Sequence, residues 1–133
     1  MRLLLDTSII LEVLLGQAKA KEAGTLLAKT DEHEFFLSDY SLHSIGLLLF
    51  RRKQYHVFRQ FLNDMMISGG MRATSLPVEN MEFVINTAQR FNLDFDDAYQ
   101  YAAAEKYNLI LVSFDADFDR TERGRKTPVE IVL

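Results

Sequence analysis

Short apolar runs along the chain alternate with longer stretches in which apolar residues recur at helical spacing. Five runs predict strands. Arg2–Leu5 and Leu109–Val112 are expected to be buried, Phe35–Leu37 and the weaker Met71–Ser75 are two further strands, and Val129–Val132 is a final edge strand. Leu109–Val112 is the clearest, because it combines strong β-formers with no polar alternation. The chain therefore starts with a strand and returns to strands at intervals.

Helical periodicity occupies the stretches between these runs. Five of the expected helices are Ser8–Leu15, Ala18–Lys29, Tyr55–Ile67, Pro77–Phe91 and Asp94–Tyr107. A sixth begins at Ser38 and Asp39 and carries Leu42, Ile45, Leu48 and Leu49 on its apolar face. Gly16 and Gly69-Gly70 end two of them. Strands that alternate with helices predict the α/β class. We expect a three-layer α/β/α sandwich with a central, mainly parallel sheet of four to five strands.

Composition limits what this fold can do. The chain has 133 residues, of which 48% are hydrophobic, and it has no linker or repeat, so one domain over residues 1–133 is expected. The absence of cysteine excludes disulfides, thiolate zinc sites and cysteine nucleophiles. Asp6 and Glu12 interrupt the apolar start, and no run approaches the roughly 20 apolar residues of a membrane span. A cytoplasmic protein is the expectation.

The net charge changes the picture of a binding partner. With 19 acidic and 15 basic residues, the formal charge is -4. A protein that held nucleic acid through phosphate contacts alone would usually be basic. An acidic balance fits carboxylates gathered around a divalent cation, which itself supplies positive charge. It equally fits a surface that simply keeps the protein in solution.

Carboxylates follow the predicted strands at the points where the strands end. Asp6 follows the first strand, and Asp115 and Asp117 follow Leu109–Ser113, while Asp97 lies in the first turn of the preceding helix. The carboxyl ends of parallel strands share one edge of the sheet, where ligands bind, so these groups should converge. Like charges brought together favour a bound cation. Oxygen ligands without histidine or cysteine suit Mg²⁺ or Mn²⁺.

Each acid also has a simpler interpretation. Asp6 could be the N-cap of the Ser8–Leu15 helix, and Asp94 with Asp97 resembles a capping box. Asp96 and Asp119 are expected to be solvated. A calcium loop starting at Asp115 is improbable, because it would need glycine at Arg120 and glutamate at Lys126. A strand followed by Asp-x-Asp is also found in aspartyl-phosphate phosphatases, which carry that strand near the start of the chain.

Three segments in this order resemble the signature of the PIN-domain family, most closely the VapC-like toxins of toxin–antitoxin pairs. They are LLLDTS at 3–8, DA at 97–98 and LVSFDADF at 111–118. The resemblance covers essentially the whole chain. It implies a parallel sheet between helices and an acidic quartet that holds Mg²⁺ or Mn²⁺ and hydrolyses RNA. Asp6, Asp97 and Asp115 match three of its positions, and Asp117 matches an auxiliary acid.

One expected acid is missing. The family's glutamate early in the helix after the second strand aligns with Ser44, which cannot supply the charge but could hold a metal-bound water. The adjacent His43 projects about 100° away on a helix and is expected to be exposed or at the core edge. The resemblance also implies that hydroxyl side chains support the site or its substrate: Thr7, Ser8, Ser44 and Ser113. The site is therefore one carboxylate short.

The leading hypothesis is a Mg²⁺- or Mn²⁺-dependent endoribonuclease in which Asp6 and Asp115 are direct ligands. RNA phosphates could contact Arg51, Arg52 and Lys53 or Arg120, Arg123 and Arg125, although each basic run could equally be a solvated surface. The alternative is a catalytically silent PIN domain that binds RNA or a protein.

The resemblance further implies a homodimer and a small antitoxin, whose contacts could include the Ser41–Phe50 helix, Phe58 and Phe61, unless these are core.

Overall fold

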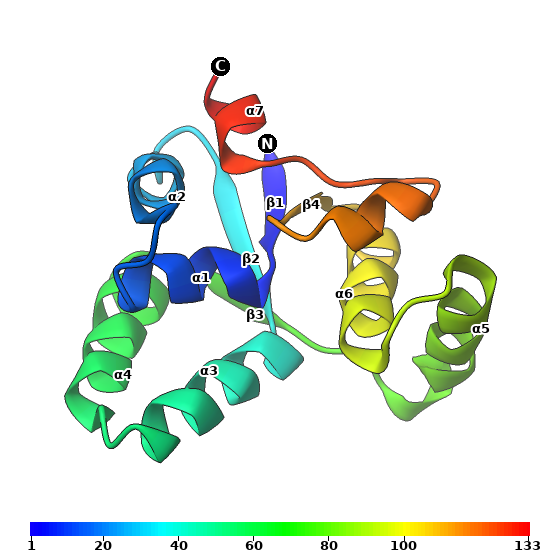
Figure 1. The fold of residues 1–133 in the computed structure, drawn as a ribbon, viewed down its shortest axis with the longest axis horizontal. Coiled ribbons are helices and arrows are strands. Elements are labelled where there is room, and N and C mark those ends of the chain that lie inside the picture. Colours follow the sequence, from blue (N-terminus) through cyan, green and yellow to red (C-terminus); the bar gives the residue numbers. More distant parts are fainter.

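A four-stranded parallel sheet forms the centre of the molecule in the computed structural model, which describes residues 1–133 (Figure 1). The strands are β1 (Arg2–Leu5), β2 (Glu34–Ser38), β3 (Arg72–Thr74) and β4 (Ile110–Val112). Their order is β3-β2-β1-β4, and Leu4 of β1 is in register with Phe36 on one side and Leu111 on the other. The four predicted strands and their parallel arrangement are confirmed, and β3, at one edge of the sheet, is largely exposed.

Helices fill the connections, as the periodicity predicted. They are α1 (Thr7–Leu14), α2 (Ala20–Leu27), α3 (Asp39–Arg51), α4 (Tyr55–Phe61) followed by a π-helical turn (Leu62–Ile67), a 3-10 turn (Val78–Asn80) leading into α5 (Met81–Phe91), α6 (Phe95–Lys106), a 3-10 turn (Ala116–Arg120) and α7 (Pro128–Val132). Ser38 caps α3 by accepting a hydrogen bond from the Ser41 amide. None of the helices is long and apolar enough to cross a bilayer.

Side chains that alternate along the strands create two cores, one on each face of the sheet. Leu3 and Leu5 of β1 pack with apolar residues from α1 to α4 and from α7, while Leu4 packs with residues from α5 and α6. Both faces of β1 are fully buried, which explains its uninterrupted leucines. The predicted three-layer α/β/α sandwich is confirmed (Figure 1).

The predicted edge strand Val129–Val132 is wrong, because residues Pro128–Val132 form helix α7. Thr127 and Glu130 make a reciprocal capping box, with Pro128 in the first turn. These residues satisfy the amides that a helix start leaves free, so they outweigh the β preference of valine and isoleucine. Only Lys126, just before the helix, pairs with the sheet, through a single parallel bridge to Val112.

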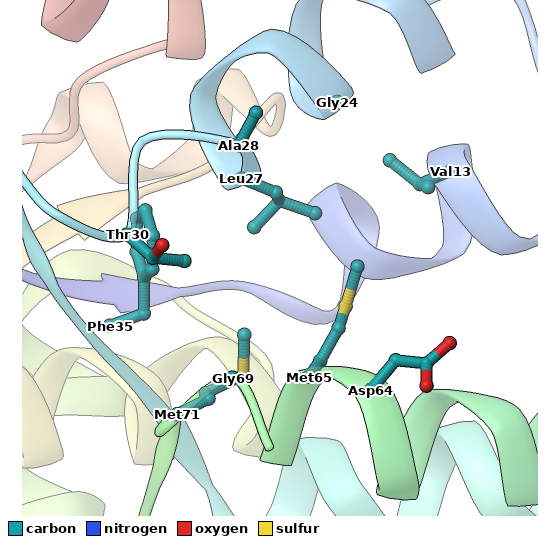
Figure 2. Close-up of a pocket in the computed structure, with 10 residues that line it drawn as sticks. All are labelled: Val13, Gly24, Leu27, Ala28, Thr30, Phe35, Asp64, Met65, Gly69 and Met71. Atoms are coloured by element: carbon teal, nitrogen blue, oxygen red, sulfur yellow. The ribbon is translucent and has the colours of Figure 1, made fainter. Parts of the chain in front are cut away.

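An apolar hollow opens at the amino ends of β2 and β3 (Figure 2). Val13, Leu27 and Met65 point into it from α1, α2 and the π-helical turn, and the Asp64 carboxylate lies to one side. One carboxylate provides no set of groups for catalysis. The chemistry of the chain is concentrated at the opposite, carboxyl edge of the sheet.

Candidate metal centre

Three carboxylates converge beyond the carboxyl ends of β1 and β4. Asp97 comes from the first turn of α6, and Asp115 and Asp117 come from the loop after β4. One oxygen from each lies within 4.8 Å of the others, and the side chains range from buried Asp97 to exposed Asp117. Oxygens that surround one divalent ion are separated by distances of about this size, since each lies about 2.0–2.6 Å from the ion. The trio is therefore compatible with a divalent metal.

Asp6 lies beside this trio and is held by three donors. Its Oδ2 accepts hydrogen bonds from Ser113 Oγ at 2.7 Å and Ser8 Oγ at 3.2 Å, and its Oδ1 accepts one from Gln100 Nε2 at 3.1 Å. Asp6 occupies the N-cap position of α1, yet its side chain makes no capping bond. The interpretation of Asp6 as a simple helix cap is thus wrong, and its carboxylate is turned toward the site.

The electrostatics of the site are most evident at Asp97. Burial raises the pKa of Asp97 from 3.8 to about 7, with further contributions from the charges of Asp96, Asp115, Asp6 and Asp117. The predicted capping box is absent, because Asp94 makes no side-chain capping bond and the Asp97 carboxyl lies in the acidic cluster. A buried carboxyl with a strongly raised pKa in a cluster of like charges is typical of a functional site.

The loop that carries two of the acids is closed at its base by backbone hydrogen bonds. Ser113 N donates to Lys126 O at 3.0 Å, and Lys126 N donates to Leu111 O at 2.9 Å. Inside the loop, the Asp115 amide donates to Ser113 Oγ, and the Asp117 amide donates to Asp115 Oδ1. These contacts fix where the two carboxylates lie relative to β4.

The basic residues of this loop brace it from within. Arg120 pairs with Asp117 at 3.1 Å and donates to two carbonyls at the C-terminal end of α5. Arg125 pairs with Asp119 and donates to the Ser113 carbonyl. Arg123 donates to the Leu109 carbonyl. Their guanidinium groups already have partners within the protein, and a cation held by Asp117 would compete with Arg120.

The predicted hydroxyl residues divide into two groups. Ser8 and Ser113 contact Asp6, and Thr7 Oγ1 donates to Ser41 Oγ at 2.8 Å beneath the site. Ser44 lies one turn further along α3, where its half-buried hydroxyl makes no hydrogen bond within the protein. It supplies neither charge nor a contact to the other site residues.

The basic run Arg51, Arg52 and Lys53 is not part of this cluster. All three residues are exposed at the far end of α3, about 18 Å along the helix from its start. His43 is also exposed, as expected.

Sequence reasoning missed one residue of the site. Gln100 is 1% exposed, and its amide group donates to both Asp6 and Ser41. It lies three positions after Asp97, on the same face of α6, and this spacing was the signal that could have identified it.

Comparison with known proteins is consistent with this geometry. The PIN domain family model matches residues 3–124, and the chain belongs to this family. No protein of curated function matches the chain by sequence.

Several solved structures share the fold. A toxin–antitoxin complex from Klebsiella pneumoniae is 22% identical, with a TM-score of 0.74, and the match covers 94% of this chain and 96% of that one. VapC20 from Mycobacterium tuberculosis, a toxin that cleaves the sarcin-ricin loop, is 21% identical, with a TM-score of 0.73 over 88% and 92%. VapBC2 from Rickettsia felis, bound to promoter DNA, is 14% identical, with a TM-score of 0.72 over 95% and 97%. At these identities the structures establish the fold.

Proposed function

We propose that this PIN domain is an endoribonuclease that requires Mg²⁺ or Mn²⁺ and is the toxin of a toxin–antitoxin pair. The observation that carries the proposal is the convergence of Asp97, Asp115 and Asp117 within 4.8 Å, beside Asp6, at the carboxyl edge of the sheet. Membership of the PIN domain family and the similarity to VapC20 support RNA as the substrate. Action in the cytoplasm follows from that role.

In this mechanism the carboxylates divide the work. Asp97, Asp115 and Asp117 would hold the ion, and Asp6, which Ser8, Ser113 and Gln100 hold beside the trio, would supply a further carboxylate. When bound, the ion would activate water and stabilise negative charge on the phosphodiester. Asp97, the most buried of the trio, is suited to orient the attacking water.

Basic side chains that have no partner within the protein are available for contacts with the substrate. Arg51 and Arg52 are exposed and have no acidic partner, so they can hold RNA phosphates away from the cleavage point. Ser44 would face the substrate side of α3 and could orient a water where the family has a carboxylate. These contacts would position the RNA backbone without reading its sequence.

The test combines Mn²⁺ binding by calorimetry with RNA cleavage on the same samples of wild type, Asp6→Asn and Asp115→Asn. We expect wild type to bind Mn²⁺ and cut RNA, and both substitutions to abolish cleavage. Asp94→Asn is the matched control, since Asp94 is exposed at the start of α6, makes no side-chain capping bond and lies outside the trio. Normal cleavage by Asp6→Asn would contradict the assignment.

The missing acid at Ser44 favours one alternative, a catalytically silent domain that binds RNA or a protein. Wild-type protein that binds RNA yet cuts none at any Mg²⁺ or Mn²⁺ concentration would support that alternative. Turnover of small phosphomonoesters would instead indicate a phosphatase.

The proposed partner is an antitoxin that covers an apolar groove between α3 and α4. The groove is lined mainly by apolar side chains, among them Leu47 and Phe50, which are 56% and 55% exposed. Phe61, in contrast, is a core residue, and Phe58 is half-buried against Gly46. The solved toxin–antitoxin complexes support such a partner, and we also propose a homodimer.

Replacing Leu47 and Phe50 together by glutamate should prevent inhibition by the product of a neighbouring antitoxin gene and leave RNA cleavage intact. Inhibition that persists in this variant would place the antitoxin elsewhere. Light scattering of the protein alone checks the dimer.

A further inference from the structure

Gln100 is the most unusual polar residue near the acidic cluster. Its side chain is 1% exposed within α6, among apolar and alanine neighbours. The Nε2 atom donates to Asp6 Oδ1 at 3.1 Å and to Ser41 Oγ at 2.7 Å. The Oε1 atom is buried and has no hydrogen-bond partner.

This arrangement disfavours the folded state unless the amide has another use. A buried carbonyl oxygen without a partner loses its hydration and gains nothing in return. Leucine has a similar size and would avoid that loss. What leucine cannot supply is the N–H that Asp6 receives from Gln100.

The orientation of the amide is fixed by its neighbours. A flipped amide would place Oε1 against the Asp6 carboxylate, whose two oxygens can only accept hydrogen bonds when it is ionised. Only the observed orientation lets Gln100 donate to Oδ1 of Asp6.

The three donors to Asp6 come from three parts of the chain, and each limits a different movement. Ser8 and Ser113 occupy Oδ2, whereas Gln100 alone holds Oδ1. A carboxylate has about four lone-pair positions, so about one remains, on Oδ1. Without Gln100, that oxygen could swing away from the trio.

We infer that Gln100 is a positioning residue, which holds the Asp6 carboxylate where it can face a divalent ion. This inference rests on the proposed function. Through Ser41, the same amide ties α6, which carries Asp97, to the start of α3. It adds a donor without adding charge, at a site that lacks the acid expected at Ser44. Residues that orient metal ligands in this way commonly contribute about 10- to 100-fold to metal affinity.

The test is Mn²⁺ affinity by calorimetry without RNA, together with thermal unfolding, for wild type and Gln100→Leu. We expect Gln100→Leu to bind Mn²⁺ about 10- to 100-fold more weakly. Its melting temperature should be equal to or above that of the metal-free wild type, since the unpartnered oxygen is gone. Gln100→Met, with a more adaptable side chain, gives a second apolar replacement.

Tyr99→Phe is the matched control. Tyr99 is buried in the same helix, and its hydroxyl donates to Asp39 and accepts from the Leu76 amide, but it does not touch Asp6. This variant should melt at a lower temperature and keep wild-type Mn²⁺ affinity. With RNA, Gln100→Leu should lower kcat and leave KM unchanged, because Gln100 is buried beneath the site.

The outcomes separate the two proposals. Wild type that binds no Mn²⁺ overturns the proposed function and this inference with it. Wild type that binds, with Gln100→Leu and Gln100→Met binding equally well, overturns the inference alone. So does a loss of affinity that Tyr99→Phe shares, since that would indicate a general effect of damage to α6.

Discussion

The two edges of the sheet differ in the chemistry of their side chains. At the amino edge, Val13, Leu27 and Met65 surround an apolar hollow with one carboxylate nearby. At the carboxyl edge, Asp97, Asp115 and Asp117 lie within 4.8 Å of one another. Both edges are formed by the same short parallel strands, so strand geometry alone does not explain the contrast.

The difference shows that the amino edge stabilises the folded state and that the carboxyl edge contains groups that destabilise it. Amino-edge side chains contribute by burial, and most changes there should alter the free energy of unfolding without altering chemistry. Carboxyl-edge side chains repel one another and include an amide oxygen without a partner. Groups that disfavour folding but converge on one point are typical of a site selected for binding or catalysis.

The largest expected effect is at the carboxyl edge. Asp97→Asn should reduce RNA cleavage about a thousandfold, because several kcal/mol of transition-state stabilisation depend on the ion. At pH 8, where Asp97 is ionised in the folded protein, the same change should raise the melting temperature of the metal-free protein, since it removes one charge from the cluster. Cleavage assays and thermal unfolding in EDTA check both effects. A fall in both activity and melting temperature would mean that Asp97 is structural.

The next largest effect is at the amino edge. Leu27→Ala should lower the free energy of unfolding by about 2–3 kcal/mol, because it enlarges the hollow and removes a buried side chain. Urea denaturation measures the loss. Cleavage per folded molecule and Mn²⁺ affinity should not change. A change in either would show that the two edges are coupled.

The pH dependence of stability distinguishes the two edges, because only the carboxyl edge contains a carboxyl with a strongly raised pKa. The pKa of Asp97 is raised to about 7, so the folded state binds a proton that the unfolded state releases near 3.8. The contribution of Asp97 to the stability of the metal-free protein should therefore be largest below about pH 4, fall as the pH rises from 4 through 7, and level off above that. Melting temperatures at pH 5 and pH 8 in EDTA measure the trend. Asp97→Asn should flatten it, and Leu27→Ala should keep it.

The smallest expected effect is a gain in stability at the amino edge. Gly24 lies inside α2 at the rim of the hollow, and a Cβ there would meet no atom within 4 Å. Gly24→Ala should stabilise the protein by about 1 kcal/mol through helix propensity. Thermal unfolding checks the gain, and cleavage should remain at the wild-type rate. Destabilisation would show that the hollow is less open than its lining suggests.

Local patterns were enough to predict most of the fold. The four strands of the sheet and the start of α3 at Ser38 follow from short-range signals: apolar runs for the strands, and a capping serine for α3. Val129–Val132 was predicted wrongly because β-forming side chains were weighed above the capping box of Thr127 and Glu130. A five-residue helix is decided by its first hydrogen bonds more than by the preferences of its side chains.

The site was only partly predictable, for a different reason. The positions of the acids relative to the predicted strands indicated that they would meet at one edge of the sheet. Asp97, Asp115 and Asp117 do converge there. Gln100 lies three positions after Asp97 on the same face of the helix, but this spacing is a weak signal, since a glutamine inside a helix is ordinarily solvated. Its use depends on Asp6 and Ser41, which are 94 and 59 residues away along the chain. Only the tertiary fold brings them together.

The closed loop between Ser113 and Lys126 has a consequence for the energetics of ligand capture. Backbone hydrogen bonds join its two ends, and side-chain bonds order its interior, so its conformational entropy is lost when the chain folds. An ion that arrives later meets ligands already in place. The ion must displace Arg120 from Asp117, but the loop itself is already ordered. Capture should thus proceed at a rate set by the removal of hydration water, with no slow rearrangement of the loop backbone.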